Sequence, residues 1–223
     1  MASKPSAAYD EVADAYSRAL DPEGVGLVDP VLTELVGDVS GKDVLSLACG
    51  QGQDARLLAS LGARVTGVDV SVEMLRYARR HEANDPRGIS YVDGDGQDLT
   101  TFIDRRFDGV VCHMALMDIP RLAPTLASVA GVLGAGGWFV FSIVHPCYGG
   151  HVAIVTDYLR EHRYRKRVPP DWLPTHAYHR PLGAYVNKLV RVGFRIERLV
   201  ETHHSAADAS GVPGLLYLRA IKR

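Results

Sequence analysis

Short apolar runs alternate with amphipathic stretches through the central part of the chain. The apolar runs are nearly continuous, which is typical of strands that are covered on both faces. Between them, apolar residues recur at helical spacing. This alternation predicts an α/β fold with a doubly wound, mostly parallel sheet. The predicted strands are 43–48, 64–68, 89–92, 107–112 and 138–144, and the predicted helices are 54–61, 72–81 and 122–133.

Two further helices precede this alternation. Residues 9–20 have apolar positions at helical spacing. A second helix is predicted to begin with Asp29 as its N-cap and Pro30 at its first position, and to end at Gly37. Ser71 is predicted to cap helix 72–81 in the same way.

The pattern is lost after the fifth strand and returns near the end of the chain. Residues 146–180 are rich in His, Tyr, Arg and Pro without a clean period, and are too many for an ordinary loop. Helix 181–192 and strands 194–201 and 214–221 follow, and the absence of a helix between these strands predicts antiparallel pairing. We therefore expect seven strands in a single domain over 1–223, with an N-terminal helical cap over 1–40 and an insertion or lid over 145–180.

Composition narrows the class of protein. The chain has 223 residues, a formal net charge of -1 and 47% hydrophobic residues, which is ordinary for a soluble globular domain. A charge so close to zero does not favour nucleic acid or a membrane surface as a partner. Three cysteines without a pairing pattern, no signal-peptide pattern and no membrane-length apolar run lead us to expect a cytoplasmic protein.

The first predicted strand leads into a glycine turn. Gly50, Gly52 and Ala55 match the G-x-G-x-x-G/A pattern, and Asp69 ends the next strand. Glycines allow a ligand to approach the backbone closely, and the following helix directs free N–H groups at it. A carboxylate such as Asp69 can accept two hydrogen bonds from a ribose diol. Together these features predict a nucleoside-bearing cofactor.

Four segments together resemble the class I S-adenosylmethionine-dependent methyltransferases. They are VLSLACGQG at 44–52, GVDVSVEML at 67–75, GDGQDL at 94–99 and VLGAGGWFVF at 132–141. The resemblance extends from about residue 9 to the C-terminus and implies a Rossmann-like fold. It implies S-adenosyl-L-methionine as cofactor and S-adenosyl-L-homocysteine as product.

The resemblance also implies roles for individual residues. The loop after the first strand would lie beside the methionine moiety and ribose, Asp69 would hold the ribose hydroxyls, and Asp95 would accept from the adenine amino group. Met74 and Tyr16 have packing as an alternative role. The implied cofactor-binding residues are Tyr16, Ala48, Gly50, Gln51, Gly52, Asp69, Val70, Met74, Asp95, Gly96, Gln97 and His113.

The chain departs from the family pattern at positions that include two near the glycine turn. Ser46 stands where the family usually has an acid that orients the cofactor's ammonium group. That contact would be weaker or indirect in this chain. Gln53 stands where many relatives have a third glycine.

Histidines are the candidate bases, because a neutral hydroxyl or amine acceptor needs one. His113 and His145 follow parallel strands and so lie at the ligand-binding edge. Pro146 restricts His145 to extended geometry, which could aim its ring at the site or make it a structural turn residue. His179 and Arg180 precede a helix, where capping and surface placement are as plausible as substrate contact. No metal site is predicted, because no cluster has metal-ligand spacing.

Basic residues over 160–167 alternate with aromatic ones. This run could be a solvated lid surface, a recognition element for a carboxylate or phosphate, or a nucleic-acid contact. The aromatic residues Tyr148, Tyr158, Trp172 and Tyr178 could wall an apolar pocket. The expected activity is methylation of a small-molecule acceptor, most often at oxygen, in secondary metabolism. The alternatives are an RNA methyltransferase, a nicotinamide-dependent dehydrogenase and a non-catalytic protein that binds S-adenosylmethionine.

Overall fold

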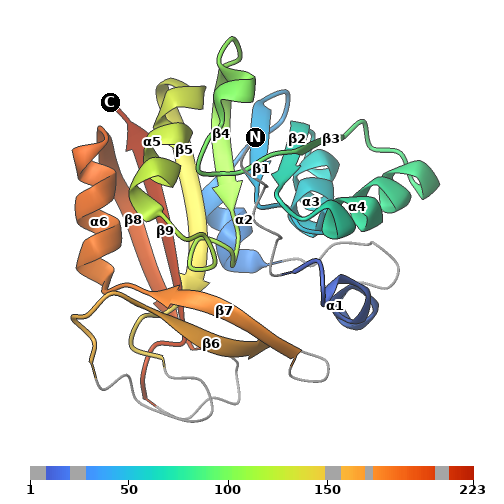
Figure 1. Ribbon diagram of the computed structural model, residues 1–223. Coiled ribbons are helices and arrows are strands. Elements are labelled where there is room, and N and C mark those ends of the chain that lie inside the picture. The colour runs from blue at the N-terminus through green and yellow to red at the C-terminus, as the bar shows by residue number, and fades with distance from the viewer. Residues whose placement is uncertain (1–8, 21–28, 149–156, 169–172, 204–210) are drawn as a thin grey trace.

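The computed structural model describes residues 9–20, 29–148, 157–168, 173–203 and 211–223 (Figure 1). Strands and helices alternate through its central part, so the predicted α/β class is confirmed. The strands are β1 Asp43–Leu47, β2 Arg64–Asp69, β3 Ser90–Asp93, β4 Phe107–Cys112, β5 Leu133–Val144, β6 His162–Val168, β7 Leu173–His179, β8 Phe194–Thr202 and β9 Leu215–Lys222. The helices are α1 Ala13–Leu20, α2 Pro30–Val36, α3 Gln53–Ser60, α4 Val72–Asn84, the 3-10 helix η1 Thr100–Phe102, α5 Leu122–Val132 and α6 Leu182–Arg191.

Seven of the strands form one sheet in the order β3-β2-β1-β4-β5-β9-β8. Strands β3, β2, β1, β4 and β5 pair in parallel, and β9 is antiparallel to both β5 and β8. This confirms the predicted doubly wound sheet and its antiparallel C-terminal pair. The carboxyl ends of the parallel strands lie at one edge of the sheet, which is where such sheets bind ligands.

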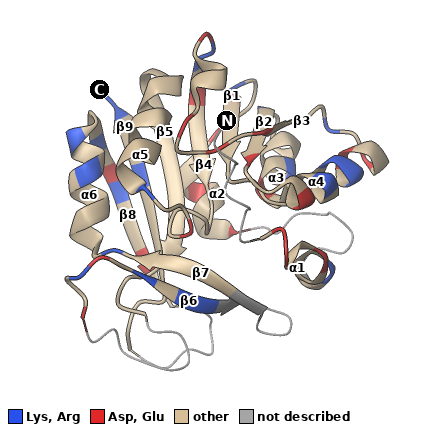
Figure 2. Ribbon diagram, viewed as in Figure 1, with Lys and Arg blue, Asp and Glu red and all other residues tan. Residues whose placement is uncertain are grey.

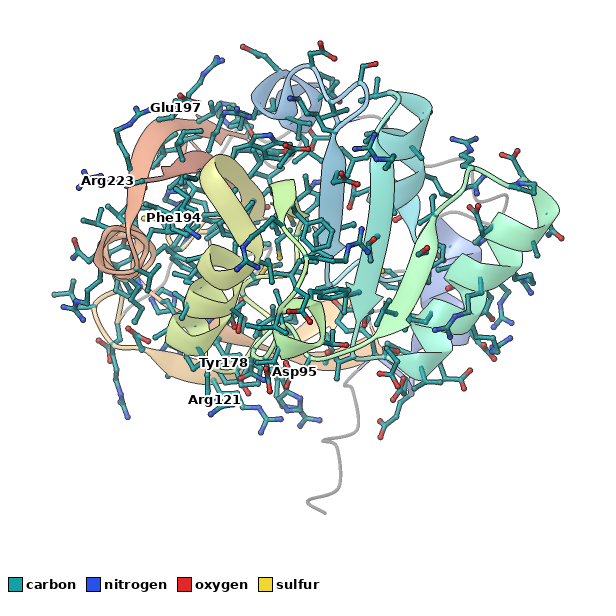
Figure 3. All side chains as sticks on the ribbon, turned by 90° about the horizontal axis from the view of Figure 1, so that it is seen from above. Asp95, Arg121, Tyr178, Phe194, Glu197 and Arg223 are labelled. Carbon is teal, nitrogen blue, oxygen red and sulfur yellow. The ribbon has the colours of Figure 1, made fainter. Side chains whose placement is uncertain are left out.

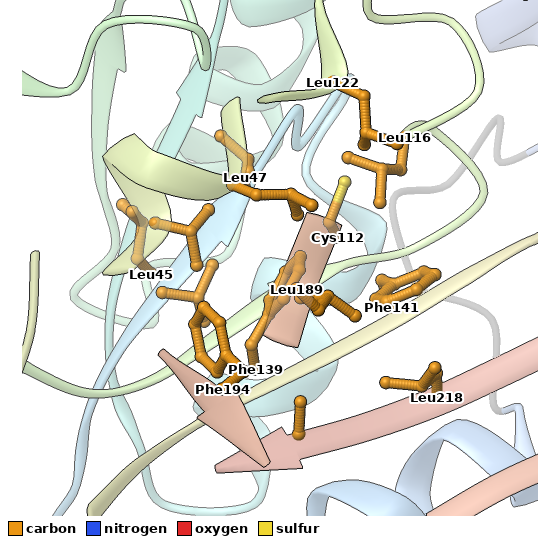
Figure 4. Packing of buried hydrophobic residues seen from close by; sticks show 14 of the residues in the cluster. Leu45, Leu47, Cys112, Leu116, Leu122, Phe139, Phe141, Leu189, Phe194 and Leu218 are labelled. Atoms are coloured by element: carbon orange, nitrogen blue, oxygen red, sulfur yellow. The ribbon is translucent and has the colours of Figure 1, made fainter. Parts of the chain in front are cut away.

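Both faces of the sheet are covered by helices. Leu45 and Phe139 point to the face that packs against α5 and α6, as do most of the residues in Figure 4. Their neighbours Val44 and Val140 point to the opposite face, where α2 and α3 pack. Adjacent residues of a strand face opposite sides, so apolar residues at every position bury both sides. This explains the continuous apolar runs in the sequence.

The predicted helix starts are confirmed where a side chain caps them. Asp29 accepts a hydrogen bond from the Leu32 N–H at 2.9 Å, and Ser71 accepts one from the Met74 N–H at 3.1 Å. Gly37 ends α2 with φ at 70°. Several boundaries differ from the prediction, and two of them differ by four residues or more. Helix α1 begins only at Ala13, and β5 begins directly after α5 without an intervening turn.

Strands β6 and β7 form a separate antiparallel hairpin. The sequence predicted an insertion over 145–180 but no regular elements within it. In Figure 1 the hairpin lies below the arrowheads of β4 and β5, at the ligand-binding edge of the sheet. A backbone hydrogen bond of 2.8 Å from Tyr178 N to Met117 O attaches it to the loop after β4. Trp172 lies outside the described residues. No helix among the described residues has the length and apolar character to cross a membrane.

Candidate functional site

A cavity of about 460 Å³ lies at the carboxyl ends of the parallel strands. Its walls come from the loops after β1, β2, β3 and β4, from the segment at α1 and from the hairpin. Of the residues predicted to bind the cofactor, those that line it are Tyr16, Ala48, Gly50, Gln51, Asp69, Val70, Met74, Asp95, Gly96, Gln97 and His113. The structure thus brings together residues that lie nearly a hundred positions apart in the sequence.

Gly52 is the exception among these residues, because it is not part of the lining. It is the N-cap of α3 and has φ at 91°, a left-handed conformation that favours glycine. A Cβ atom at this position would collide with the hydroxyl of Tyr91. Gly52 therefore serves the turn and the packing beneath the loop.

The loop between β1 and α3 is bent tightly around the cavity. Ala48 has φ at 52° and Gly50 has φ at 54°, and a left-handed alanine is uncommon. Residues held in such conformations gather at ligand-binding sites, where the surrounding structure maintains them. Here the Cys49 N–H donates to Val68 O and the Gly52 N–H donates to Cys49 O.

Asp69 is held at the end of β2. Its carboxylate accepts hydrogen bonds from the Gly50 N–H at 2.7 Å and from the Ser71 N–H at 2.8 Å. Burial raises the pKa of Asp69, and these backbone hydrogen bonds oppose that effect. The carboxylate thereby ties the glycine loop to the start of α4 and fixes its own position in the lining.

Asp95 belongs to a chain of polar contacts. Gln97 donates its backbone N–H to Asp95 at 2.9 Å, and its side-chain amide donates to both carboxylate oxygens. The side-chain Oε1 of Gln97 in turn accepts from the Arg121 backbone N–H and guanidinium. Figure 3 shows Asp95, Arg121 and Tyr178 in one region of the molecule, far from Phe194 and Glu197. This chain orients Asp95 in the cavity wall.

The segment that contains α1 contributes Tyr9 and Tyr16 to the cavity lining. The Tyr9 hydroxyl donates to Asp118 at 3.1 Å, and Asp10 accepts from the Ser71 hydroxyl at 2.6 Å. Tyr9 and Tyr16 lie edge to face with ring centroids 5.4 Å apart. The predicted contact of Tyr16 with the cavity therefore has a structural basis in this docked segment.

His113 is held between two carboxylates. Its Nδ1 lies 2.9 Å from Asp54 and its Nε2 lies 3.3 Å from Asp29. Burial lowers the pKa of His113, but the charge of Asp54 and the contacts with both carboxylates outweigh it and raise the pKa to about 10. The ring is therefore a fixed cation at neutral pH, and this geometry does not support the expected role as a base.

Asp29 belongs to the same group as His113. Burial raises the pKa of Asp29, but hydrogen bonds from His113, the Leu32 N–H and Tyr217 outweigh it and lower the pKa to about 2. The Tyr217 hydroxyl donates at 2.8 Å. The N-cap of α2 is thus also the partner of a histidine in the cavity, which the sequence pattern did not reveal.

His145 lies outside the cavity lining. Its ring is 4% exposed, its Nδ1 accepts from the Cys147 N–H at 3.0 Å, and its Nε2 lies 2.8 Å from Glu201. Both ring nitrogens are therefore engaged in the turn after β5. Of the two roles open to His145 in the sequence, this geometry favours the structural one.

Other lining residues were not assigned to the site from the sequence. Asp118 binds Lys166 of β6 through both carboxylate oxygens, at 2.6 and 2.7 Å. Arg163 and His176 of the hairpin also line the cavity. His179 and Arg180, for which surface placement was considered, are buried. Among the described residues, no group of His, Cys, Asp or Glu could hold a metal ion.

Comparisons with known proteins agree with this architecture. A family model described as a methyltransferase domain matches residues 45–141. A ubiquinone biosynthesis O-methyltransferase from Nitrosomonas europaea is 27% identical over 187 residues, covering 80% of this chain and 78% of that protein. A fatty-acid O-methyltransferase from Mycolicibacterium smegmatis is 36% identical over 118 residues, covering 52% and 42%.

The solved structures extend the likeness to the whole fold. The crystal structure of a putative S-adenosylmethionine-dependent methyltransferase from Listeria monocytogenes has a TM-score of 0.72 and 26% sequence identity, and the match covers 86% of this chain and 96% of that one. Residues 45–141 thus match a methyltransferase domain, and the sheet order and overall fold are similar to those of S-adenosylmethionine-dependent methyltransferases, which supports an enzyme of this kind.

Proposed function

We propose that the protein transfers a methyl group from S-adenosylmethionine to an oxygen atom of a small-molecule acceptor, in secondary metabolism. One observation carries this proposal. One cavity is lined both by the glycine loop, Asp69 and Asp95 and by residues of the β6–β7 hairpin. A cofactor and a small acceptor can meet there, and the cavity volume is within the range of ligand sites.

The chemistry of the lining fits the cofactor. Asp69 presents a fixed carboxylate at the strand end, which suits a ribose diol. Val70 and Met74 offer apolar surface beside it, and Asp95 offers a carboxylate for an adenine amino group. When bound, the cofactor supplies an activated methyl group on a sulfonium centre, which leaves as a neutral thioether.

The protein then has to position the acceptor and exclude water. We propose that the cap over 1–40 and the insertion over 145–180 do this. In the described residues, Tyr9 of the cap and Lys166 of the insertion both bind Asp118. This contact joins the two covers over the cavity. Methylation at oxygen is supported by the two curated relatives, both named as O-methyltransferases.

The test begins with cofactor binding. Calorimetry with S-adenosylmethionine, S-adenosylhomocysteine and NAD should show binding of the first two and none of NAD. Transfer of a labelled methyl group to a panel of phenols, hydroxy acids and amines should then yield an O-methyl ether or ester. Cofactor binding without transfer to any acceptor would instead favour a protein that only binds the cofactor.

The RNA alternative is tested in the same assay. An RNA methyltransferase should label RNA, and its RNA binding should weaken steeply with salt, because phosphate contacts release counterions. Labelling of RNA in preference to all small acceptors would overturn the proposed acceptor class.

A further inference from the structure

One face of the β6–β7 hairpin carries polar side chains that the cofactor half of the cavity does not use. Antiparallel pairing places Arg163 opposite Tyr178 and Arg165 opposite His176. Paired residues lie on the same face of a two-stranded sheet, so these four side chains share one face. Arg163, His176 and Tyr178 line the cavity, whereas Arg165 does not.

His176 differs from the other histidines near the site. His113 is held by two carboxylates, and His145 and His179 are engaged through their ring nitrogens. His176 is half-buried, and among the described residues none is recorded as hydrogen-bonded to its ring. An imidazole nitrogen that is accessible from the cavity can accept a proton from a bound acceptor.

Arg163 differs from the other basic residues of the hairpin in a similar way. Figure 2 shows basic residues along β6. Lys166 is already neutralised by Asp118, at 2.6 Å. Among the described residues, Arg163 is the one arginine or lysine that lines the cavity. It forms no ion pair with another described residue. A guanidinium without a carboxylate partner at a ligand cavity is suited to bind a carboxylate or phosphate.

We propose that this hairpin face is the acceptor subsite, in which Arg163 binds an anionic group of the acceptor and His176 takes the proton of the hydroxyl that is methylated. The proposal rests on the proposed O-methyl transfer and adds the substrate class, a hydroxyl compound that carries a carboxylate or phosphate.

The register sets the spacing of the two residues on the hairpin face. Arg163 and His176 are diagonal neighbours on one face, and such positions lie roughly 7–8 Å apart. A single aromatic ring with a hydroxyl and an anionic group at opposite ends can span this distance, and Tyr178 offers a ring surface beside it. The proposed subsite therefore suits an acceptor that is a hydroxyaryl carboxylate or a hydroxyaryl phosphate.

In the assigned step, the acceptor O–H bond breaks and its proton goes to the free nitrogen of His176. An O–C bond forms to the transferred methyl group. The electron pair of the broken C–S bond stays on sulfur as a neutral thioether, and the proton later leaves His176 for water. The step is balanced without an oxidant or a metal.

The anion site is tested by binding to the complex with S-adenosylhomocysteine. The probes are 4-hydroxy-3-nitrobenzoate, 4-hydroxyphenyl phosphate and the neutral 4-hydroxy-3-nitrobenzamide, measured by calorimetry. Arg163→Met should lower the affinity for the preferred anionic probe by at least about tenfold, as expected for a lost charge-assisted contact. Its affinity for the neutral probe should be unchanged. The matched control is Arg165→Met, which removes an arginine from the same face but outside the lining.

The proton acceptor is tested with the nitrophenol probe, whose phenolate is coloured. Bound to the wild type, it should be ionised at a pH at which the free probe is protonated. His176→Gln should lose this ionisation while binding the anionic probe within about threefold of the wild type. His162→Gln, which changes an exposed histidine of β6, should behave as the wild type does.

The two proposals fail in distinguishable ways. If the wild type does not bind S-adenosylhomocysteine, the proposed function itself is overturned. If it binds that product but shows no preference for either anionic probe, or if Arg163→Met and Arg165→Met have equal effects, the anion subsite is overturned. If ionisation of the bound nitrophenol survives in His176→Gln, His176 is not the proton acceptor. Preference for the carboxylate or for the phosphate probe identifies which anion the site takes.

Discussion

At the scale of the residue, His113 shows how burial and charge determine a role that residue type alone does not. A histidine at a strand end suggests a base, yet Asp29 and Asp54 keep this ring protonated. The neighbouring carboxylates come from α2 and α3, whose spatial relation to β4 no local pattern encodes. His113 is therefore better described as a cation in the cavity wall that joins the start of α2, the start of α3 and the end of β4.

This description predicts a pH-dependent contribution to stability. The folded-state pKa of His113, about 10, lies above its ordinary value, so its stabilisation is fully present below about pH 6.5 and is lost as the pH rises towards 10. His113→Gln should lower the free energy of unfolding by roughly 1–3 kcal/mol near pH 6, since two partly buried carboxylates lose their cation. Urea unfolding of both proteins from about pH 6 to about pH 9.5 should show this difference shrinking. A difference that stays constant would contradict the assigned charge state.

Asp69 supports a prediction about the cofactor. Its carboxylate both fixes the glycine loop and faces the cavity. Asp69→Ala should weaken S-adenosylhomocysteine binding by about 1.5–3 kcal/mol, the value of lost charge-assisted hydrogen bonds. Calorimetry measures the loss, and Asp98→Ala, at an exposed acid outside the lining, is the control. Equal affinity of Asp69→Ala and the wild type would remove Asp69 from the cofactor site.

At the scale of the element, the hairpin is anchored by a buried arginine. Arg180 is 3% exposed, and its guanidinium donates to Ile119 O and Pro120 O, each at 2.7 Å. These carbonyls belong to the loop after β4, and both residues line the cavity. The end of β7 is thereby joined to the cavity wall.

Arg180→Met should therefore destabilise the protein more than an ordinary arginine substitution. Two part-buried hydrogen bonds, from this guanidinium to carbonyl oxygens of the loop after β4, would be lost at a cost of about 1–2 kcal/mol each. Thermal or urea unfolding should show a loss of roughly 2–4 kcal/mol. Arg160→Met is the matched control, because the Arg160 side chain is 75% exposed and lies 3.9 Å from Asp157. If both variants unfold alike, the anchoring role is wrong.

The elements that the sequence predicted are those with an apolar pattern. The parallel strands and their helices follow from runs such as the one around Val44, because burial on both faces leaves a clear signal. The hairpin left no such signal, since its strands carry His, Tyr and basic residues on both faces. The burial of Arg56 and Arg180 was equally hidden, because only the folded chain brings carbonyls and carboxylates to their guanidinium groups.

At the scale of the whole molecule, the two halves of the candidate site differ in how far the sequence could predict them. The cofactor half comes from contiguous motifs and could be predicted almost completely. The acceptor half comes from the hairpin and from Asp118, which meet only through the fold. Tyr9 and Lys166 converge on this carboxylate, so Asp118 couples the segment that leads into α1 to the hairpin.

This coupling predicts which segments of the chain are stabilised when a ligand binds. S-Adenosylhomocysteine at about a hundred times its Kd should stabilise the folded state by about 2.7 kcal/mol, which corresponds to a rise of roughly 5–11 °C in Tm for a chain of this size. The added protection against hydrogen exchange should concentrate in residues 9–20 and in the loops after β1 and β2, which line the cavity or dock over it. Strand β8, at the far edge of the sheet, should gain the least. Protection spread evenly over the sheet would mean that the covering segments do not respond to the ligand.

With Lys166→Met, the gain in protection at residues 9–20 should fall while the gain at the glycine loop remains, because only the bridge through Asp118 is broken.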